Sequence, residues 1–142
     1  MLNMPNNSQN MKDWVILVVD DTPDNLVVIE VVLKYHGAQV HTAISADAGF
    51  KLLESISPTV ILLDIRMPHV NGIEMLKQLQ ENPTTAHIPV IAITAYAMDD
   101  DREKFLGLGF DGYMAKPFDI FTFVPEVQQI VLKTRGTLHS KL

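Results

Sequence analysis

Three short, uninterrupted apolar runs constrain the fold of this chain more than any other feature of the sequence. They are Val15–Val19, Val60–Leu63 and Val90–Ile93, each four or five residues long and rich in β-branched side chains. Runs of this length are too short for helices, and unbroken apolarity is typical of central strands in a parallel sheet that is covered on both faces. The sequence therefore predicts three buried parallel strands.

Two weaker strand candidates and five helical patterns complete the chain. Segment 38–43 (AQVHTA) alternates apolar with polar residues and segment 112–116 (GYMAK) is short and mixed, so both suit the edges of a sheet. The first helix begins at Thr22-Pro23, an N-cap followed by proline at the first helical position, and Gly37 ends it. Further helices are expected over 46–55, 71–81, 99–107 and 121–133.

Two of these helices carry residues that oppose a helix. The first contains Val27, Val28 and Val31, which favour a strand by propensity, but its caps and its length of about fourteen residues favour a helix. The last contains Pro125, which is tolerated in a first turn, so that helix is expected to start near Thr122.

Alternation of five strands with five helices is typical of an α/β fold. The expected architecture is a doubly wound five-stranded parallel sheet of strand order 2-1-3-4-5, a flavodoxin-like three-layer sandwich. One domain is expected over 14–134, with a flexible polar tail over 1–13 and a short C-terminal tail over 135–142. In such sheets ligands bind beyond the carboxyl ends of the strands.

Composition excludes several functional classes. A net charge of −6 argues against direct binding of nucleic acid, and no apolar stretch is long enough to insert into a membrane. The chain has no cysteine, so disulfides and thiolate chemistry are excluded and the cytoplasm is the expected compartment. The five histidines show no spacing typical of metal ligands.

Polar side chains stand at the carboxyl end of each buried run. Asp20 and Asp21 follow the first run, Asp64 the second and Thr94 the third, and Lys116 ends the last strand. Three carboxylates at one rim disfavour one another's ionisation unless a cation is present, and Mg²⁺ prefers such oxygen ligands. The sequence therefore predicts a magnesium site built on Asp20, Asp21 and Asp64.

A carboxylate, a metal, a hydroxyl and a lysine together suit phosphoryl transfer. Asp64 is the expected acceptor, because a carboxylate can attack phosphorus and form an aspartyl phosphate. Lys116 would neutralise one phosphoryl oxygen and Thr94 would donate a hydrogen bond to another. Asp20 alone would be interpreted as a helix cap, Thr94 as a strand-end threonine and Lys116 as a surface lysine; their common placement favours the site.

Four segments resemble one family in the family's own order. They are VVDD (18–21), ILLDIRMPHVNG (61–72), PVIAITAYA (89–97) and GYMAKPF (112–118), and they span about residues 14–134. The chain resembles a response regulator receiver domain of two-component signalling, of the stand-alone, chemotaxis-regulator-like type. The resemblance implies phosphorylation of Asp64 by a histidine kinase or a histidine phosphotransfer protein, and a downstream protein target.

The resemblance also assigns roles that the residue pattern alone does not. It makes the backbone carbonyl of Arg66 a metal ligand, Thr94 and Tyr113 the switch residues, and the peptide bond before Pro117 cis. It places the output surface on the fourth helix, the fifth strand and the fifth helix. It implies a switch that assists its own Mg²⁺-dependent phosphorylation and dephosphorylation and is not a turnover enzyme.

Three alternative functions were weighed. A receiver-like interaction module that is never phosphorylated could lose the acceptor, the acid pair and the lysine, but all are present. An aspartyl-phosphate phosphatase would carry a further acid two residues after the nucleophile, where Arg66 stands. A dinucleotide-binding domain would need a glycine-rich turn after the first strand, which the sequence lacks.

Overall fold

The computed structural model describes residues 10–67, 71–94, 101–116 and 119–140, and only the backbone of 101, 120 and 135–140. The strands are β1 Val15–Val19, β2 Gln39–Ala43, β3 Val60–Asp64, β4 Val90–Thr94 and β5 Gly112–Ala115. The helices are α2 Pro23–Tyr35, α3 Ala46–Leu53, α4 Gly72–Glu81, α5 Asp101–Leu108 and α6 Ile120–Ser140. Most boundaries lie within two residues of those predicted, which is the usual uncertainty of a helix or strand end.

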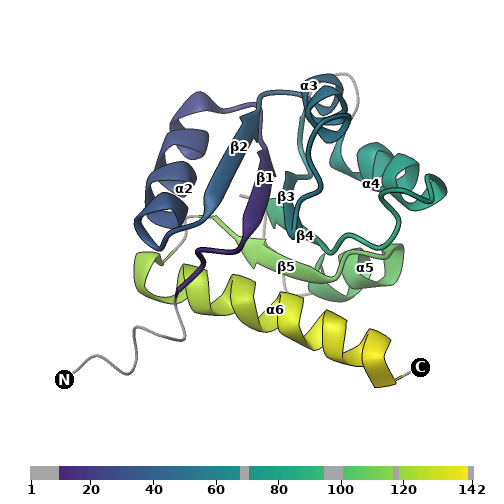
Figure 1. Ribbon diagram of the computed structural model, residues 1–142. Coiled ribbons are helices and arrows are strands. Elements are labelled where there is room, and N and C mark those ends of the chain that lie inside the picture. The colour runs from purple at the N-terminus through teal and green to yellow at the C-terminus, as the bar shows by residue number, and fades with distance from the viewer. Residues whose placement is uncertain (1–9, 68–70, 95–100, 117–118, 141–142) are drawn as a thin grey trace.

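The five strands form one parallel sheet in the order β2-β1-β3-β4-β5, as predicted (Figure 1). The register places Val19 opposite both Ala43 and Leu63, and Asp64 opposite Ile93. Because parallel strands end at the same edge, the residues that follow β1, β3, β4 and β5 share one rim of the sheet.

Each face of the sheet is covered by its own helices (Figure 1). On one face, Ile16 and Val18 of β1 belong to a core that includes side chains of α2 and α6. On the other, Leu17 and Val19 belong to a core that includes side chains of α3, α4 and α5. Alternate residues of one strand thus enter two separate cores, as the pleat of a strand requires, and the unbroken apolar runs of the sequence are explained.

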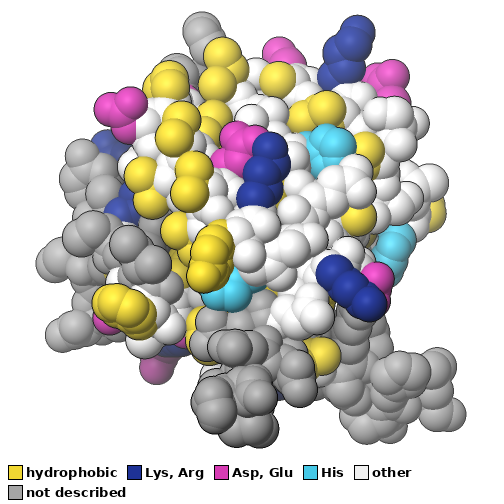
Figure 2. All heavy atoms as spheres, turned by 60° about the vertical axis from the view of Figure 1, so that its left-hand side comes forward, with side chains coloured by type: hydrophobic (Ala, Val, Ile, Leu, Met, Phe, Trp, Pro, Cys, Tyr) yellow, Lys and Arg dark blue, Asp and Glu magenta, His cyan; other side chains and the backbone are white. Residues whose placement is uncertain are grey.

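The valine-rich helix α2 forms as its caps predicted. The carbonyl of Thr22 accepts hydrogen bonds from the N–H groups of Asn25 and Leu26, and proline stands at the first helical position. The helix buries Leu26, Ile29 and Leu33, whereas four large apolar side chains on its outer side are exposed: Val27, Val28, Val31 and Tyr35. Figure 2, with this side of the molecule turned forward, shows hydrophobic side chains gathered there.

The predicted start of the last helix was wrong. α6 begins at Ile120, because the Asp119 carboxylate accepts the N–H of Phe121 at 2.9 Å and fixes an earlier first turn. Pro125 therefore lies in the second turn and leaves the carbonyl of Phe121 without its usual helical donor. The side chain of Phe121 is 87% exposed, so water can serve this carbonyl instead. The helix also continues past the predicted end at 133, to Ser140.

The N-terminal side of the domain contributes one core residue before the first predicted strand. Met11 is fully buried among side chains of the core beneath α2 and α6, and its N–H donates to the carbonyl of His36. Residues 1–9 lie outside the described residues. Among the helices of the described residues, none combines the length and apolarity needed to cross a membrane.

Candidate functional site

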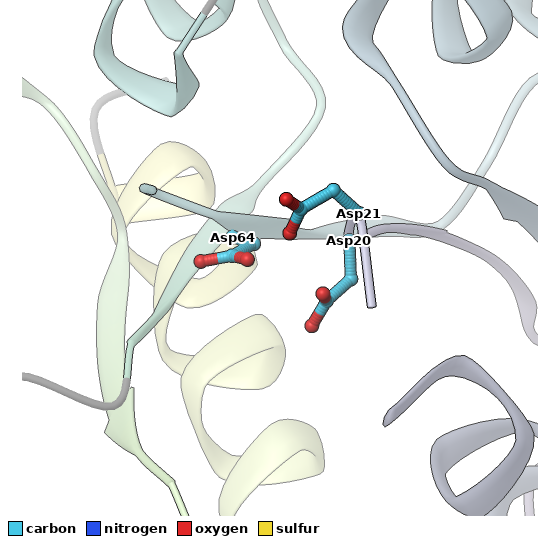
Figure 3. Close-up of side chains that lie close together, drawn as sticks. All are labelled: Asp20, Asp21 and Asp64. Atoms are coloured by element: carbon cyan, nitrogen blue, oxygen red, sulfur yellow. The ribbon is translucent and has the colours of Figure 1, made fainter. Parts of the chain in front are cut away.

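The three acids predicted to form a metal site lie together at the carboxyl edge of the sheet. Asp20 and Asp21 follow β1 and Asp64 ends β3, the neighbouring strand, and their side chains approach one another in Figure 3. One carboxylate oxygen from each lies within 4.8 Å of the others. The strand register places these groups, because β1 and β3 are hydrogen-bonded neighbours that end at the same level.

Backbone hydrogen bonds fix two of these carboxylates. Asp20 Oδ1 accepts the N–H of Thr22 at 2.9 Å, and Asp64 Oδ1 accepts the N–H of Arg66 at 3.1 Å. Each acid thus bonds to the backbone two residues later, a local turn that holds the side chain over the end of its own strand. Asp20 also contributes to the start of α2, as its interpretation as a capping residue expected. Each carboxylate keeps its second oxygen for other partners.

Lys116 joins the two buried acids. Its Nζ donates to Asp20 Oδ2 at 2.7 Å and lies 3.6 Å from Asp64 Oδ2. The N–H of Lys116 donates to the carbonyl of Thr94 at 2.8 Å, which continues the pairing of β5 with β4 and carries the lysine to the rim. One ammonium against three carboxylates leaves the site with an excess of negative charge.

Burial makes this excess costly. Asp20 is 0% exposed and Asp64 is 4% exposed, whereas Asp21 is exposed to solvent. Burial raises the pKa of Asp64 from 3.8 to about 6; the N–H of Arg66 opposes the rise, the charge of Asp20 adds to it, and Lys116 opposes it. A hard divalent cation would relieve the strain, and the all-oxygen donor set of the site fits Mg²⁺.

The hydroxyl and the aromatic residue predicted to form the switch occupy neighbouring strands. Thr94 ends β4 and is 2% exposed. Tyr113, one residue into β5, is buried, and its ring stacks on that of Phe105 of α5 with 5.6 Å between centroids. The sequence pattern does not predict this aromatic contact between β5 and α5.

A cavity lies beside Thr94. It has a volume of about 610 Å³ and opens between the segment after β3, the start of α4 and helix α5. Its lining residues are Ile65, Arg66, Met67, Asn71, Ile73, Thr94, Lys104 and Phe105. Thr94 and Phe105 thus both border open space at the surface.

Several predicted features lie outside the described residues. These are the first two residues of the helix expected over 99–107, parts of the family-like segments 61–72 and 89–97, and the peptide bond before Pro117. Of Arg66, the structure places the N–H on Asp64, and metal ligation by its carbonyl stays a prediction. Sequence reasoning missed Asn71 and Gly72, which begin α4 next to Asp64; the pair Asn-Gly ahead of an apolar helical pattern was the available signal.

Comparison with known proteins agrees with this geometry. The family model of the response regulator receiver domain matches residues 16–128. An uncharacterized 14.6 kDa protein in the sodA1 3′ region of Leptolyngbya boryana is 37% identical over 124 residues, which cover 87% of this chain and 95% of that protein. The polar-differentiation response regulator DivK of Brucella ovis is 30% identical, over 80% of this chain and 92% of its own length.

Other relatives are longer, and solved structures share the fold. The DNA-binding dual master transcriptional regulator RpaA of Synechocystis is 30% identical, and the match covers 84% of this chain but 49% of RpaA. The receiver domain of the Francisella response regulator 1452 has a TM-score of 0.76 and 26% identity, covering 85% of this chain and 98% of that one. The chemotaxis protein CheY4 of Vibrio cholerae has the same TM-score at 22% identity, covering 82% and 98%.

Proposed function

This chain belongs to the response regulator receiver domain family, and from that premise we propose that Asp64 accepts a phosphoryl group and that its phosphorylation switches a protein-interaction surface. The observation that carries the proposal is the position of Lys116, whose ammonium lies between the carboxylates of Asp20 and Asp64 with Asp21 beside them. A phosphoryl group on Asp64 would meet a cation there, together with the metal-binding oxygens.

The transfer is a displacement at phosphorus. A carboxylate oxygen of Asp64 forms a bond to phosphorus while the bond from phosphorus to the histidine nitrogen of the donor breaks. When bound, Mg²⁺ would neutralise charge on a phosphoryl oxygen, with Asp20, Asp21, Asp64 and the Arg66 carbonyl holding it. Lys116 moves its ammonium from the carboxylates to a second phosphoryl oxygen, and the Thr94 hydroxyl donates to a third.

Phosphorylation then reaches the surface through β4 and β5. Movement of Thr94 toward the phosphoryl group changes the wall of the cavity that it shares with Phe105, and the ring of Phe105 stacks on Tyr113. Tyr113 exchanges between the buried position described here and a second position. The surface formed by α5, β5 and α6 changes with it, and phosphorylation shifts the populations of the two states.

The donor and the target follow from this function. The donor is a histidine kinase or a histidine phosphotransfer protein in the cytoplasm, and the target is a protein that distinguishes the two states of the α5–β5–α6 surface. Such a protein is a switch and not a turnover enzyme, although it assists its own phosphorylation and dephosphorylation. The family membership of the chain supports these partners.

The test is phosphorylation by acetyl phosphate with Mg²⁺, read as the gain of one acid-stable, base-labile phosphoryl group. Asp64→Asn removes the nucleophile and is expected to abolish labelling. Asp111→Asn is the matched control, because Asp111 is another acid with a raised pKa but accepts the N–H of Val90 at the opposite end of β4. It is expected to label at the wild-type rate.

Two outcomes would contradict the proposal. Label that survives in Asp64→Asn would assign the acceptor to another residue. A wild-type chain that takes no label from acetyl phosphate or from a phosphorylated kinase would support the alternative, a receiver-like interaction module that functions without phosphorylation.

A further inference from the structure

Helix α4 begins in direct contact with the backbone that carries the acceptor. The N–H of Gly72, the first residue of α4, donates to the carbonyl of Ile65 at 3.0 Å. A Cβ atom at Gly72 would lie 2.5 Å from the carbonyl oxygen of Asp64 and 2.7 Å from the Cα of Ile65. Side-chain carbons do not approach backbone atoms so closely, so this contact exists because residue 72 has no side chain.

The backbone on the other side of this contact is held in place. Asp64 pairs with Ile93 in the sheet, and the N–H of Ile65 donates to the carbonyl of Ile93 at 3.2 Å. α4 is anchored as well, because the Asn71 side chain caps it by accepting the N–H of Glu74 at 2.9 Å. Neither partner can retreat without breaking hydrogen bonds.

At other crowded glycines a Cβ would meet side chains rather than backbone, as at Gly112, where the nearest atom is Ile130 Cδ1 at 2.6 Å. A Cβ at Gly49 would meet the ends of two side chains, Met75 Cε at 3.0 Å and Val19 Cγ2 at 3.2 Å, which can shift. A Cβ at Gly107 would meet nothing within 4 Å. The crowding at Gly72 involves the backbone of the phosphorylatable residue itself.

We infer that Gly72 is a positioning residue for phosphoryl transfer: by lacking a side chain it lets α4 seat against Asp64 and Ile65, which holds the Asp64 carboxylate in register with Asp20 and Lys116. The inference rests on the proposed function of Asp64. Gly72 contacts no phosphoryl group; it acts through the position of the β3 end.

The expected effect follows from the distances. A Cβ at residue 72 would lie 2.5 Å from the Asp64 carbonyl oxygen, whereas ordinary contact begins at 3.4 Å. The two atoms must therefore move apart by about 0.9 Å. A displacement near 1 Å at a reacting group can lower a rate by about 10²-fold. Because α4 takes up part of the shift, Gly72→Ala is expected to lower the phosphorylation rate by about 10- to 100-fold.

The experiment compares Gly72→Ala with Gly49→Ala and Gly107→Ala. Phosphorylation by acetyl phosphate is measured at saturating Mg²⁺, with the folded fraction of each variant determined by urea titration under the same conditions. Gly107→Ala and Gly49→Ala are expected to react at the wild-type rate per folded molecule, even if Gly49→Ala lowers stability. Gly72→Ala is expected to react slowly and to shift the amide resonances of Asp64 and Ile65.

A Gly72→Ala variant that is less stable but reacts at the wild-type rate per folded molecule would overturn the inference. If that variant does not fold, Asn71→Ala replaces it in the test. This substitution loosens the start of α4 without adding bulk and is expected to lower the phosphorylation rate by a few-fold. An unchanged rate would overturn the inference. If the wild-type chain takes no label, the proposed function fails. In that case the Mg²⁺ dissociation constant tests whether Gly72 positions the Asp64 carboxylate. The inference requires this constant to rise in Gly72→Ala and to stay unchanged in the two controls.

Discussion

The two helical layers of the molecule differ in the lengths of their helices and in the open space beside them. On one side, α2 and α6 are 13 and 21 residues long, and their core includes fully buried side chains from Met11 to Val131. On the other, α3, α4 and α5 have 8, 10 and 8 residues, and an open cavity of about 610 Å³ lies against α5. We call them the α2–α6 layer and the α3–α5 layer.

This difference matches two proposed roles: one layer supports the acidic site, and the other changes on phosphorylation. Thr94 lines the cavity of the α3–α5 layer, and Tyr113 and Phe105 belong to its core. Open space beside an element leaves it room to move, and elements that move in switching are drawn from the less stable parts of a fold. In the proposed switch, the α2–α6 layer, packed against the same strands, would hold β1 and therefore Asp20 in place while the other layer rearranges.

The largest difference is expected between two phenylalanines. Phe123→Ala in the α2–α6 layer should lower the free energy of unfolding by about 3–5 kcal/mol, because a fully packed core cannot collapse around the lost ring. Phe105→Ala should lower it by about 1–3 kcal/mol, because Phe105 already borders a cavity and its lining can relax. Urea titration of both variants measures the two values.

The same two variants also test whether the two layers differ in packing at all. Phe123 is 2% exposed and Phe105 is 7% exposed, so burial alone predicts nearly equal losses. Equal losses would show that the two layers are equally well packed. Phosphorylation-induced shifts at β5 should be altered in Phe105→Ala and retained in Phe123→Ala.

A smaller effect is expected from pH in the absence of divalent cations. The pKa of Asp64 is about 6 in the fold against 3.8 ordinarily, so the folded state takes up a proton that the unfolded chain does not. In EDTA, the free energy of unfolding should therefore rise by about 1 kcal/mol as pH falls from 7.5 to 5, and level off below about 4, where both states are protonated.

Asp64→Asn should remove most of this pH dependence. The pKa of Asp111 is also raised, because its carboxyl is partly desolvated beside the start of β4. The variant Asp111→Asn therefore measures how much Asp111 contributes to the pH dependence of the free energy of unfolding. An undiminished slope in Asp64→Asn would mean that the rim carboxylate is not the group that titrates. With Mg²⁺ present the slope should reverse, since Mg²⁺ and protons compete for Asp64.

The smallest change in stability, below about 1 kcal/mol, is expected for Thr94→Ala. This variant should still accept phosphate, because Asp64, Lys116 and the metal-binding acids remain. It should lose much of the phosphate-induced chemical-shift change over residues 101–113, because in the proposed coupling the movement of Thr94 is what reaches Phe105 and Tyr113. Full phosphorylation with undiminished shifts would contradict the proposed coupling.

The strand order and the meeting of Asp20, Asp21, Asp64 and Lys116 were predictable because few topologies accommodate five short parallel strands, and their polar ends must share a rim. Features set by tertiary contact were not predictable. The start of α6 depended on the Asp119 cap, and burial of Met11 depended on a space beneath α2 and α6. The contact at Gly72 depends on how α4 packs against the end of β3, and the Asn-Gly pair in the sequence signals only where the helix begins.

The ion pair between Lys116 and Asp20 has a consequence for how the protein is made. The pair joins residues 96 positions apart. The ribosome therefore synthesises the acids at the ends of β1 and β3 well before Lys116, the cation that pairs with them. At about 5–20 residues per second, that interval lasts roughly 5–20 s. Asp64 precedes Lys116 by 52 positions, so for roughly 3–10 s of that interval the nascent chain holds Asp64 without the lysine.

Completion of the sheet and completion of the site are therefore one event. β5 has to dock on β4 before Lys116 can reach Asp20, because the Lys116 N–H is fixed on the carbonyl of Thr94. Mg²⁺ that binds this rim would stabilise the complete fold, by mass action, relative to intermediates in which β5 is not yet docked. Under the proposed function, the chain becomes a substrate for phosphorylation only when β5 is in place.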